Sequence, residues 1–229
     1  MTLSSNALCT LADLKTELGI TVTTFDTTLE RMIESSTAAI EKYCGRPQGF
    51  HWETARVDNV KGFGTVILHV PKTPLLSIAS IVFDPDDAND TVAATEYRID
   101  NAQQGRIYRE NGWLWTVAFG EAILTHPLPG TEESLFRVTY AGGFKTANQV
   151  GTNPPGLGVT GPRTLPYDLE DACITLAALR YRWAARDPAV NSERLLSWGA
   201  SYNSDRGAGS IVPRDVAGVL DGYARVAWA

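Results

Sequence analysis

The chain has 229 residues, of which 44% are hydrophobic, enough for one large domain or two smaller ones with real cores. Its formal net charge of −6 argues against electrostatic binding to nucleic acid or to an anionic membrane. No apolar run of roughly 18 residues is present, and the first ten residues lack the features of a signal peptide. Cys9, Cys44 and Cys173 are irregularly spaced, which is typical of reduced thiols in a cytosolic product.

The first 50 residues predict a helical hairpin. One short helix is expected over residues 10–19, with Thr10 at its start and Gly19 at its end. A longer helix is expected from about Asp26 or Thr27 to Cys44, with Thr27 and Glu30 as its capping pair. Its inner stripe is formed by Leu29, Ile33, Ser36, Ile40 and Tyr43.

From about residue 51 the hydrophobic pattern changes to a period of two, which indicates strands. The segments at residues 52–60 and 65–70 flank Gly62–Gly64 and predict a hairpin. Further strands are expected at residues 75–84, 96–99, 105–108, 113–117 and 135–140. Turn signals at short, regular spacing favour an antiparallel sandwich or barrel over residues 51–145.

The clearest helix in the sequence lies between Thr164 and Pro188, after a loop rich in glycine and proline at residues 142–163. Its apolar stripe is formed by Leu169, Cys173, Leu176, Arg180 and Trp183. An irregular stretch at residues 197–210 precedes a final helix that starts near Pro213.

The order of these elements predicts an α+β fold. The N- and C-terminal helices are expected to form one helical bundle, and the antiparallel β-domain to be inserted into it. The predicted divisions are an N-terminal helical hairpin at residues 1–50, the β-domain at 51–145, and a loop with two helices at 146–229.

Three sequence patterns could indicate ligand or metal binding, but the residues around each of them do not fit such a site. The glycines at residues 156–161 match a dinucleotide-binding spacing, but prolines flank them and no strand precedes them. The acidic loop at residues 84–90 has Asn89 where a calcium loop requires glycine. The three histidines have no partners at metal-binding spacing. We therefore expect no catalytic, cofactor-binding or metal-binding residue, and no enzyme.

Several phrases occur in a fixed order almost from end to end of the chain. They are LADLKTELGI, LERMIESSTAAIEKYCGRP, TPLLSIASIVFD, EYRID, GRIY, VTYAGGF, LPYDLEDACITLAALRYRWAARDP and VPRDVAGVLDGYARV. Together their order and spacing resemble the head–tail connector (adaptor) family of tailed bacteriophages. The long glycine- and proline-rich loop and the long stretch before the last helix depart from that pattern.

The resemblance implies a structural protein of the virion, made in the host bacterial cytoplasm. Such proteins form a ring of about twelve subunits under the portal, extend the DNA channel and offer a docking surface to a neck stopper or tail protein. DNA would pass through the lumen without specific binding, and no membrane is involved. The alternatives are another neck or tail-end protein, such as a stopper or terminator, or a soluble α+β enzyme.

The C-terminal segment at residues 211–229 is the predicted portal contact, because it stays apolar up to the last residues. The hypothesis rests on Val216, Val219, Leu220, Tyr223, Val226 and Trp228. The alternative is that this stripe packs on the long helix of the same subunit.

Overall fold

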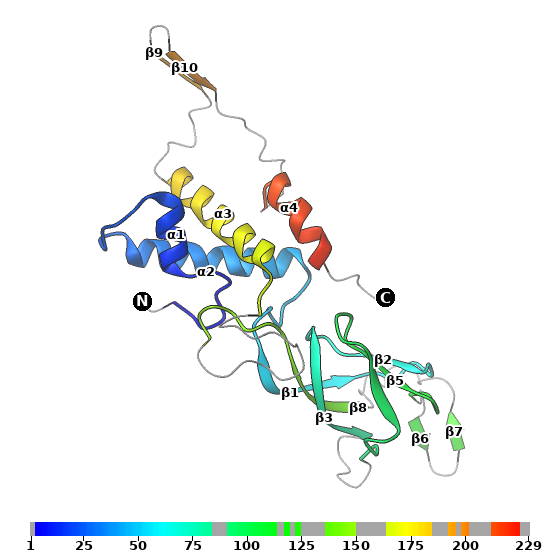
Figure 1. Ribbon diagram of the computed structural model, residues 1–229. Helices are drawn as coiled ribbons and strands as arrows, with labels where there is room; N and C mark the ends of the chain where they lie inside the picture. The colour runs from blue at the N-terminus through cyan, green and yellow to red at the C-terminus, as the bar shows by residue number, and fades with distance from the viewer. Residues whose placement is uncertain are drawn as a thin grey trace. The chain divides into compact units, whose positions relative to one another are not determined.

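The computed structural model describes residues 3–83, 91–113, 117–119, 122–124, 136–149, 164–184, 192–195, 198–201 and 212–224. The chain divides into two compact units, which are treated separately below (Figure 1). The helical unit comprises residues 1–49, 146–151 and 165–229, and the β unit comprises residues 50–145 and 152–164. The fold is thus α+β, with four α-helices and antiparallel sheets in the described part of the chain. Among the described residues, no helix is long and apolar enough to cross a membrane.

The two N-terminal helices differ in how they begin. Helix α1 spans Leu11–Leu18, and the Thr10 hydroxyl accepts the Asp13 N–H at 3.1 Å, as the sequence predicted. Gly19 ends this helix in the left-handed conformation. Helix α2 spans Asp26–Tyr43 and has no side-chain cap. The capping pair predicted at Thr27 is therefore wrong, because Thr27 lies inside the first turn.

Two further α-helices complete the helical unit. Helix α3 spans Tyr167–Ala184, and helix α4 spans Arg214–Leu220 and continues into the short 3-10 helix η1, Asp221–Tyr223. The unit also contains an antiparallel strand pair, β9 (Ser192–Leu195) and β10 (Trp198–Ser201). Since β10 lies in the stretch predicted to be irregular, that prediction is wrong there. Its glycine and its serine favoured a loop, but pairing with β9 makes it a strand.

The helical unit has an apolar core that draws on α1, α2, α3 and α4 and on the segment before α1. Its fully buried members include Leu8, Leu14, Leu29, Ile33, Ile40, Leu169 and Leu220. The stripe predicted for α2 is buried from Leu29 to Ile40, while Tyr43 remains 38% exposed. Burial of this kind supplies most of the stability of short helices in proteins.

The segment before α1 is held by residues that come just after the β unit. The Thr146 hydroxyl donates to the Ser5 carbonyl at 2.7 Å. The Asn148 side-chain amide donates to the Ala7 and Cys9 carbonyls at 3.0 and 2.9 Å. These bonds satisfy backbone carbonyls that have no strand or helix partner there. The N-terminal segment is thereby fixed within the helical unit.

The β unit contains two three-stranded antiparallel sheets. One has the order β1 (Glu53–Val60), β8 (Phe136–Gly142), β3 (Leu75–Phe83). The other has the order β2 (Ile67–His69), β5 (Arg106–Arg109), β4 (Tyr97–Asn101). A further pair joins β6 (Val117–Phe119) to β7 (Ala122–Leu124).

Both three-stranded sheets contribute to one apolar cluster. Its buried members include Leu68, Val70, Leu75, Ile81, Ile107, Trp113, Phe136, Val138 and Tyr140. The rings of Trp113 and Phe136 meet edge to face, with their centroids 5.3 Å apart. The aromatic pair ties the loop after β5 to the start of β8.

The hairpin predicted from β1 to β2 is wrong. Strand β1 pairs with β8, and β2 pairs with β5, so the two strands lie in different sheets. Residues 62–64 therefore connect the sheets instead of turning within one. The acidic loop at residues 84–90 and the glycine-rich match at residues 156–161 lie outside the described residues.

Gly143 shows why the sequence needs glycines at the end of β8. Its φ is +100°, and a Cβ atom built there would lie 2.2 Å from the carbonyl oxygen of His51. No side chain fits such a contact, and L-residues rarely adopt this conformation. The Gly142–Gly143 pair in the phrase VTYAGGF thus allows the chain entering the β unit and the chain leaving it to pass closely.

Candidate assembly surfaces

The inner side of the C-terminal segment fills the core of its own helical unit. Val216 is 4% exposed and Leu220 is fully buried. The Cys44 thiol donates to the Leu220 carbonyl at 3.7 Å, and the Arg46 guanidinium donates to the Tyr223 carbonyl at 3.1 Å. Part of the stripe predicted to contact the portal therefore packs within the subunit.

Two tyrosine hydroxyls hold the segment to the neighbouring helices. The Tyr43 hydroxyl of α2 donates to Asp221 at 2.6 Å. The Tyr223 hydroxyl donates to both carboxylate oxygens of Asp168 on α3, at 2.7 and 2.8 Å. Asp221 raises the pKa of Tyr43, and burial together with Asp168 raises the pKa of Tyr223. Both phenols stay protonated at neutral pH and keep donating.

Sequence reasoning missed these anchors, although one signal was present. Tyr43, Cys44 and Arg46 belong to the phrase YCGR, which ends the second predicted helix. All three contact the C-terminal segment in the structure. Their separation of 176 to 178 residues from their partners gives no local pattern from which the pairing could be read.

The outer side of α4 is open. Val219 is 39% exposed. Gly218 and Gly222 flank it, and a Cβ atom added at either would meet nothing within 4 Å. Val226 and Trp228, also in the portal hypothesis, lie outside the described residues. Of the six predicted residues, Val219 is the described one that presents an apolar side chain outward.

Other large apolar side chains are exposed on each unit. In the helical unit they are Val22, Phe25, Tyr43 and Tyr167, and in the β unit they are Val57, Phe63 and Val66. Phe25, in the connection before α2, packs edge to face on Tyr181 near the end of α3. Each unit thus exposes apolar side chains that are candidates for contacts with other proteins.

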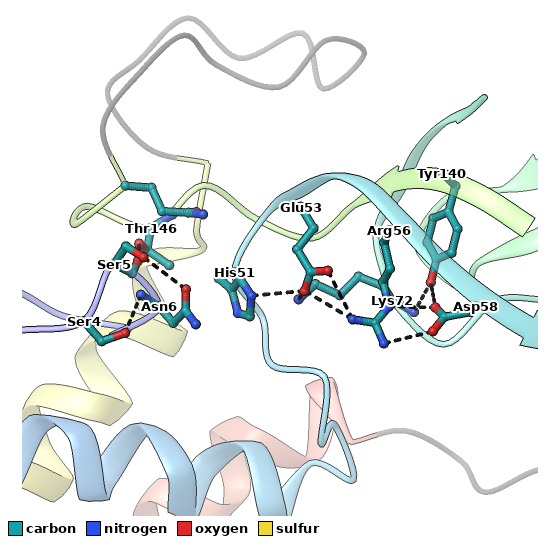
Figure 2. A network of polar contacts seen from close by, with 11 residues as sticks. Ser4, Ser5, Asn6, His51, Glu53, Arg56, Asp58, Lys72, Tyr140 and Thr146 are labelled. Carbon is teal, nitrogen blue, oxygen red and sulfur yellow. Dashed lines mark hydrogen bonds and ion pairs between the residues drawn. The ribbon is translucent and has the colours of Figure 1, made fainter.

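The β unit carries a network of charged side chains around Glu53 on β1 (Figure 2). The Lys72 ammonium lies 2.9 Å from the Glu53 carboxylate and has no exposed side-chain surface. Arg56 donates to both oxygens of the same carboxylate at 3.2 Å. The imidazole Nε2 of His51 lies 3.1 Å from it. One partly exposed carboxylate thus neutralises a buried ammonium group.

The network extends to Asp58 at the other end of β1. Arg56 forms a second pair of bonds with the Asp58 carboxylate, at 2.7 and 2.9 Å. The Tyr140 hydroxyl of β8 donates to Asp58 at 2.5 Å and accepts the Lys72 backbone N–H at 3.0 Å. These bonds join β1, β8 and the loop before β3. Buried polar groups that are satisfied in this way rigidify a fold.

The pKa values follow from this arrangement. Burial and the nearby Lys72 lower the pKa of His51, so its imidazole is neutral at neutral pH. Burial alone would raise the pKa of Glu53, but the bond from Lys72 and the charges of Lys72 and Arg56 lower it. Burial and the bond to Asp58 raise the pKa of Tyr140. At neutral pH, His51 is therefore neutral, Glu53 is ionised and the Tyr140 hydroxyl keeps its proton.

The chemistry of this network is that of a structural ion cluster. Its two carboxylates are engaged by cations, and its histidine carries no nucleophile partner in the contacts described above. Among the residues that the structure describes, no group of three or more histidine, cysteine, aspartate or glutamate side chains could hold a metal ion. The arrangement holds β1, β8 and the loop before β3 together.

Comparison with solved structures gives a likeness that covers the whole chain. A chain from the neck of an empty GTA particle, computed with C6 symmetry, has a TM-score of 0.54 and 15% identity. That likeness covers 100% of this chain and 95% of the other. A chain from the neck of a native GTA particle, computed with C12 symmetry, has a TM-score of 0.50, 16% identity and coverage of 100% and 94%. At these identities the likeness concerns the fold.

Comparison of the sequence gives a family. A sequence profile described as "Phage gp6-like head-tail connector protein" matches residues 9–104, from the N-terminal segment to the turn before β5. No curated protein matches the chain. The matched family is structural, and the profile covers the YCGR anchor as well as the first strands. The description of this family agrees with the predicted class of function, a structural connector at the head–tail junction. Through residues 9–104, the chain carries the sequence pattern of the phage gp6-like head-tail connector family.

Proposed function

We propose that this protein forms a ring of about twelve copies beneath the portal of a phage-like particle, where it extends the DNA channel. The observation that carries the proposal is the family match over residues 9–104, together with a whole-chain fold likeness to chains of particle necks. The ring would be part of the particle neck, and the chain would be made in the host bacterial cytoplasm. It would act without catalysis.

Several features of the chain support a ring. A closed ring needs heterologous contacts, in which one face of each subunit meets a different face of its neighbour. The exposed apolar side chains of the helical unit and of the β unit lie on separate elements, so each unit would offer contacts of its own. The net charge of −6 suits a channel through which DNA slides, since a strongly basic wall would hold the phosphates.

The domain organisation belongs to the same proposal. Residues 1–50 and 146–229 would form one helical bundle, with residues 51–145 as an inserted domain whose two sheets close into a sandwich or barrel. The shared apolar cluster of the two sheets supports closure.

We propose the C-terminal segment as the portal contact, with Val219 as its exposed centre. Val216, Leu220 and Tyr223 would shape this surface from within, because they anchor α4 to α2 and α3. Val226 and Trp228 would extend it towards the chain end. The open glycines beside Val219 would let a partner's backbone approach closely.

Electron microscopy of the protein mixed with its cognate portal tests the role as a whole. The expected result is a ring of connector subunits at the portal vertex. A stopper or terminator would instead bind a connector or the tail end, and an enzyme would bind neither. Failure to decorate portals under conditions in which other neck proteins do so would contradict the proposal.

A point substitution tests the portal surface. Val219→Asp should reduce portal occupancy at least tenfold, because it places a charge at the centre of an apolar contact. Val22→Asp is the matched control, since Val22 is also an exposed valine of the helical unit, at 52% exposure. Equal occupancy for both variants would place the contact elsewhere. This substitution is sharper than deleting residues 221–229, which would also remove the bonds of Asp221 and Tyr223.

A further inference from the structure

Two of the three cysteines meet inside the helical unit. The sulfur atoms of Cys9 and Cys173 lie 3.6 Å apart, although 164 positions separate them in the sequence. Both side chains are fully buried. Cys9 belongs to the segment before α1, and Cys173 belongs to α3. Their irregular spacing hid this pairing at the level of the sequence.

The pair lies where several segments are held together. The Thr37 hydroxyl of α2 lies 3.7 Å from the Cys173 sulfur and accepts the Leu8 N–H at 3.2 Å. The Asn148 side-chain amide donates to the Cys9 carbonyl at 2.9 Å. The third cysteine, Cys44, is buried elsewhere in the unit and contacts the Leu220 carbonyl through its thiol. Cys44 therefore serves as a control, because it is a buried cysteine outside the Cys9–Cys173 pair.

We propose that Cys9 and Cys173 are a latent disulfide, which forms when the protein moves from a reducing compartment to an oxidising one. A disulfide needs a sulfur–sulfur distance of about 2.05 Å, so the two atoms would have to approach by roughly 1.5 Å. Changes in side-chain torsion at two cysteines can supply a movement of this size. The oxidant would be a small-molecule disulfide such as oxidised glutathione.

The exchange balances in two steps. One cysteine thiolate attacks the small-molecule disulfide, forms a mixed disulfide and releases one small thiol. The second cysteine loses its proton, attacks the protein sulfur of the mixed disulfide and releases the second small thiol. The protein loses two protons and two electrons, and the small-molecule disulfide is reduced to two thiols.

Burial makes the reaction slow in the folded state. The contact with Cys173 and burial both raise the pKa of Cys9, so little thiolate is present at neutral pH. An oxidant reaches the pair only when the segment before α1 opens. The thiols thus persist in a reducing cytosol, and the bond forms over the long life of a particle outside the cell, where disulfides are stable.

The bond would tie the N-terminal segment to α3. It would close a loop that contains the whole β unit, and closure of a long loop lowers the entropy of the unfolded chain. The helical unit would then be cross-linked between segments that lie on either side of the β unit in the sequence. A neck component that must outlast the cell would become harder to unfold.

The test uses the full chain. Wild-type protein, Cys44→Ser, Cys9→Ser and Cys173→Ser are each incubated with oxidised glutathione, then denatured, alkylated and mapped by mass spectrometry. Wild type and Cys44→Ser should give a linked peptide pair that contains Cys9 and Cys173, with a mass about 2 Da below that of the two reduced peptides. Neither of the other variants should give it. Cys44 should stay unlinked and react with the alkylating reagent.

A second measurement keeps the proposal falsifiable if exchange is slow. The incubation is repeated at a urea concentration below the unfolding transition, which opens the N-terminal segment more often. The oxidised wild type should melt several degrees above the reduced form, and Cys9→Ser should show no such difference. Full alkylation of both cysteines under both conditions, or a link to Cys44 instead, would overturn the proposal. The compartment change rests on the proposed function, but the chemical assay does not, so the two can fail separately.

Discussion

Glu53 neutralises Lys72, whose side chain is fully buried in the β unit. Glu53→Gln should lower the free energy of unfolding of the β unit by about 2–3 kcal/mol, since it removes a charged partner of a buried cation. Because Glu53 is partly exposed, this loss should lie at the low end of the losses seen when buried ion pairs are broken. Urea unfolding measures it.

Asp100→Asn is the control for this prediction. The pair between Arg106 and Asp100 is also in the β unit, but its two side chains are 35% and 34% exposed. Its loss should cost less than about 1 kcal/mol, as exposed pairs do. Equal destabilisation by the two substitutions would show that burial of Lys72 does not matter.

His51 predicts a dependence of stability on pH. Its pKa is below the usual 6.5, so the unfolded chain binds more protons than the folded one just below that pH. The stability of the β unit should therefore fall as the pH drops from about 6.5 towards the folded-state pKa. Glu53 adds a further loss below pH 4.5, because its folded-state pKa is also lowered.

His51→Gln should remove the first part of this loss and leave the second. Lys72, Glu53 and Arg56 all act on the His51 imidazole, which the variant lacks, so the loss that begins near pH 6.5 should disappear. Glu53 keeps its contacts with Lys72 and Arg56 in the variant, so the loss below pH 4.5 should remain. Urea unfolding at a series of pH values distinguishes the two parts. Identical profiles for wild type and His51→Gln would assign the loss above pH 4.5 to another group.

At the scale of elements, the helices could be predicted because their signals are local. The Thr10 cap, the Gly19 stop and the stripe from Leu29 to Ile40 all lie within the helices that they define. Strand pairing could not be predicted in this way. Strand β8 lies between β1 and β3, so the partner of Glu53–Val60 begins at Phe136. No turn residue marks a contact of that separation.

The role of the apolar stripe in the C-terminal segment could not be predicted from local sequence signals either. The outward position of Val219 and the inward positions of Val216 and Leu220 follow from helical spacing once the partner helices are known. The sequence alone could not separate a portal-binding stripe from a core stripe, because both are apolar. The bonds from Tyr43 and Tyr223 decide which side of the helix faces inward.

Helix α4 should behave as a docked element. Leu220→Ala should destabilise the helical unit by about 2–5 kcal/mol, because it leaves a cavity in a fully buried position. Hydrogen exchange of the α4 amides should then accelerate, as the helix detaches from α2 and α3. Val219→Ala, on the exposed side of the same helix, should leave exchange nearly unchanged. Fast exchange of α4 in the wild type would contradict docking.

The whole molecule consists of two compact units, each with its own core. Glu53→Gln and Leu220→Ala therefore should act on different unfolding transitions, and their effects should add in the double variant. Differential scanning calorimetry checks this prediction. A single transition that both substitutions shift equally would show that the units unfold together.

The division of the chain between the units has a consequence for its synthesis. The helical unit is built from both ends of the sequence, whereas the central stretch of the β unit runs continuously from residue 50 to residue 145. On the ribosome, α2 and its apolar face, which includes Leu29, Ile33 and Ile40, emerge long before α3, which begins at Tyr167 and packs against α2. Residues 50–145 of the β unit can therefore fold while the apolar face of α2 is still uncovered, because α3 has not yet been synthesised. Chains that end early would keep this face exposed, so incomplete products rather than finished subunits would be the species that chaperones and proteases must clear.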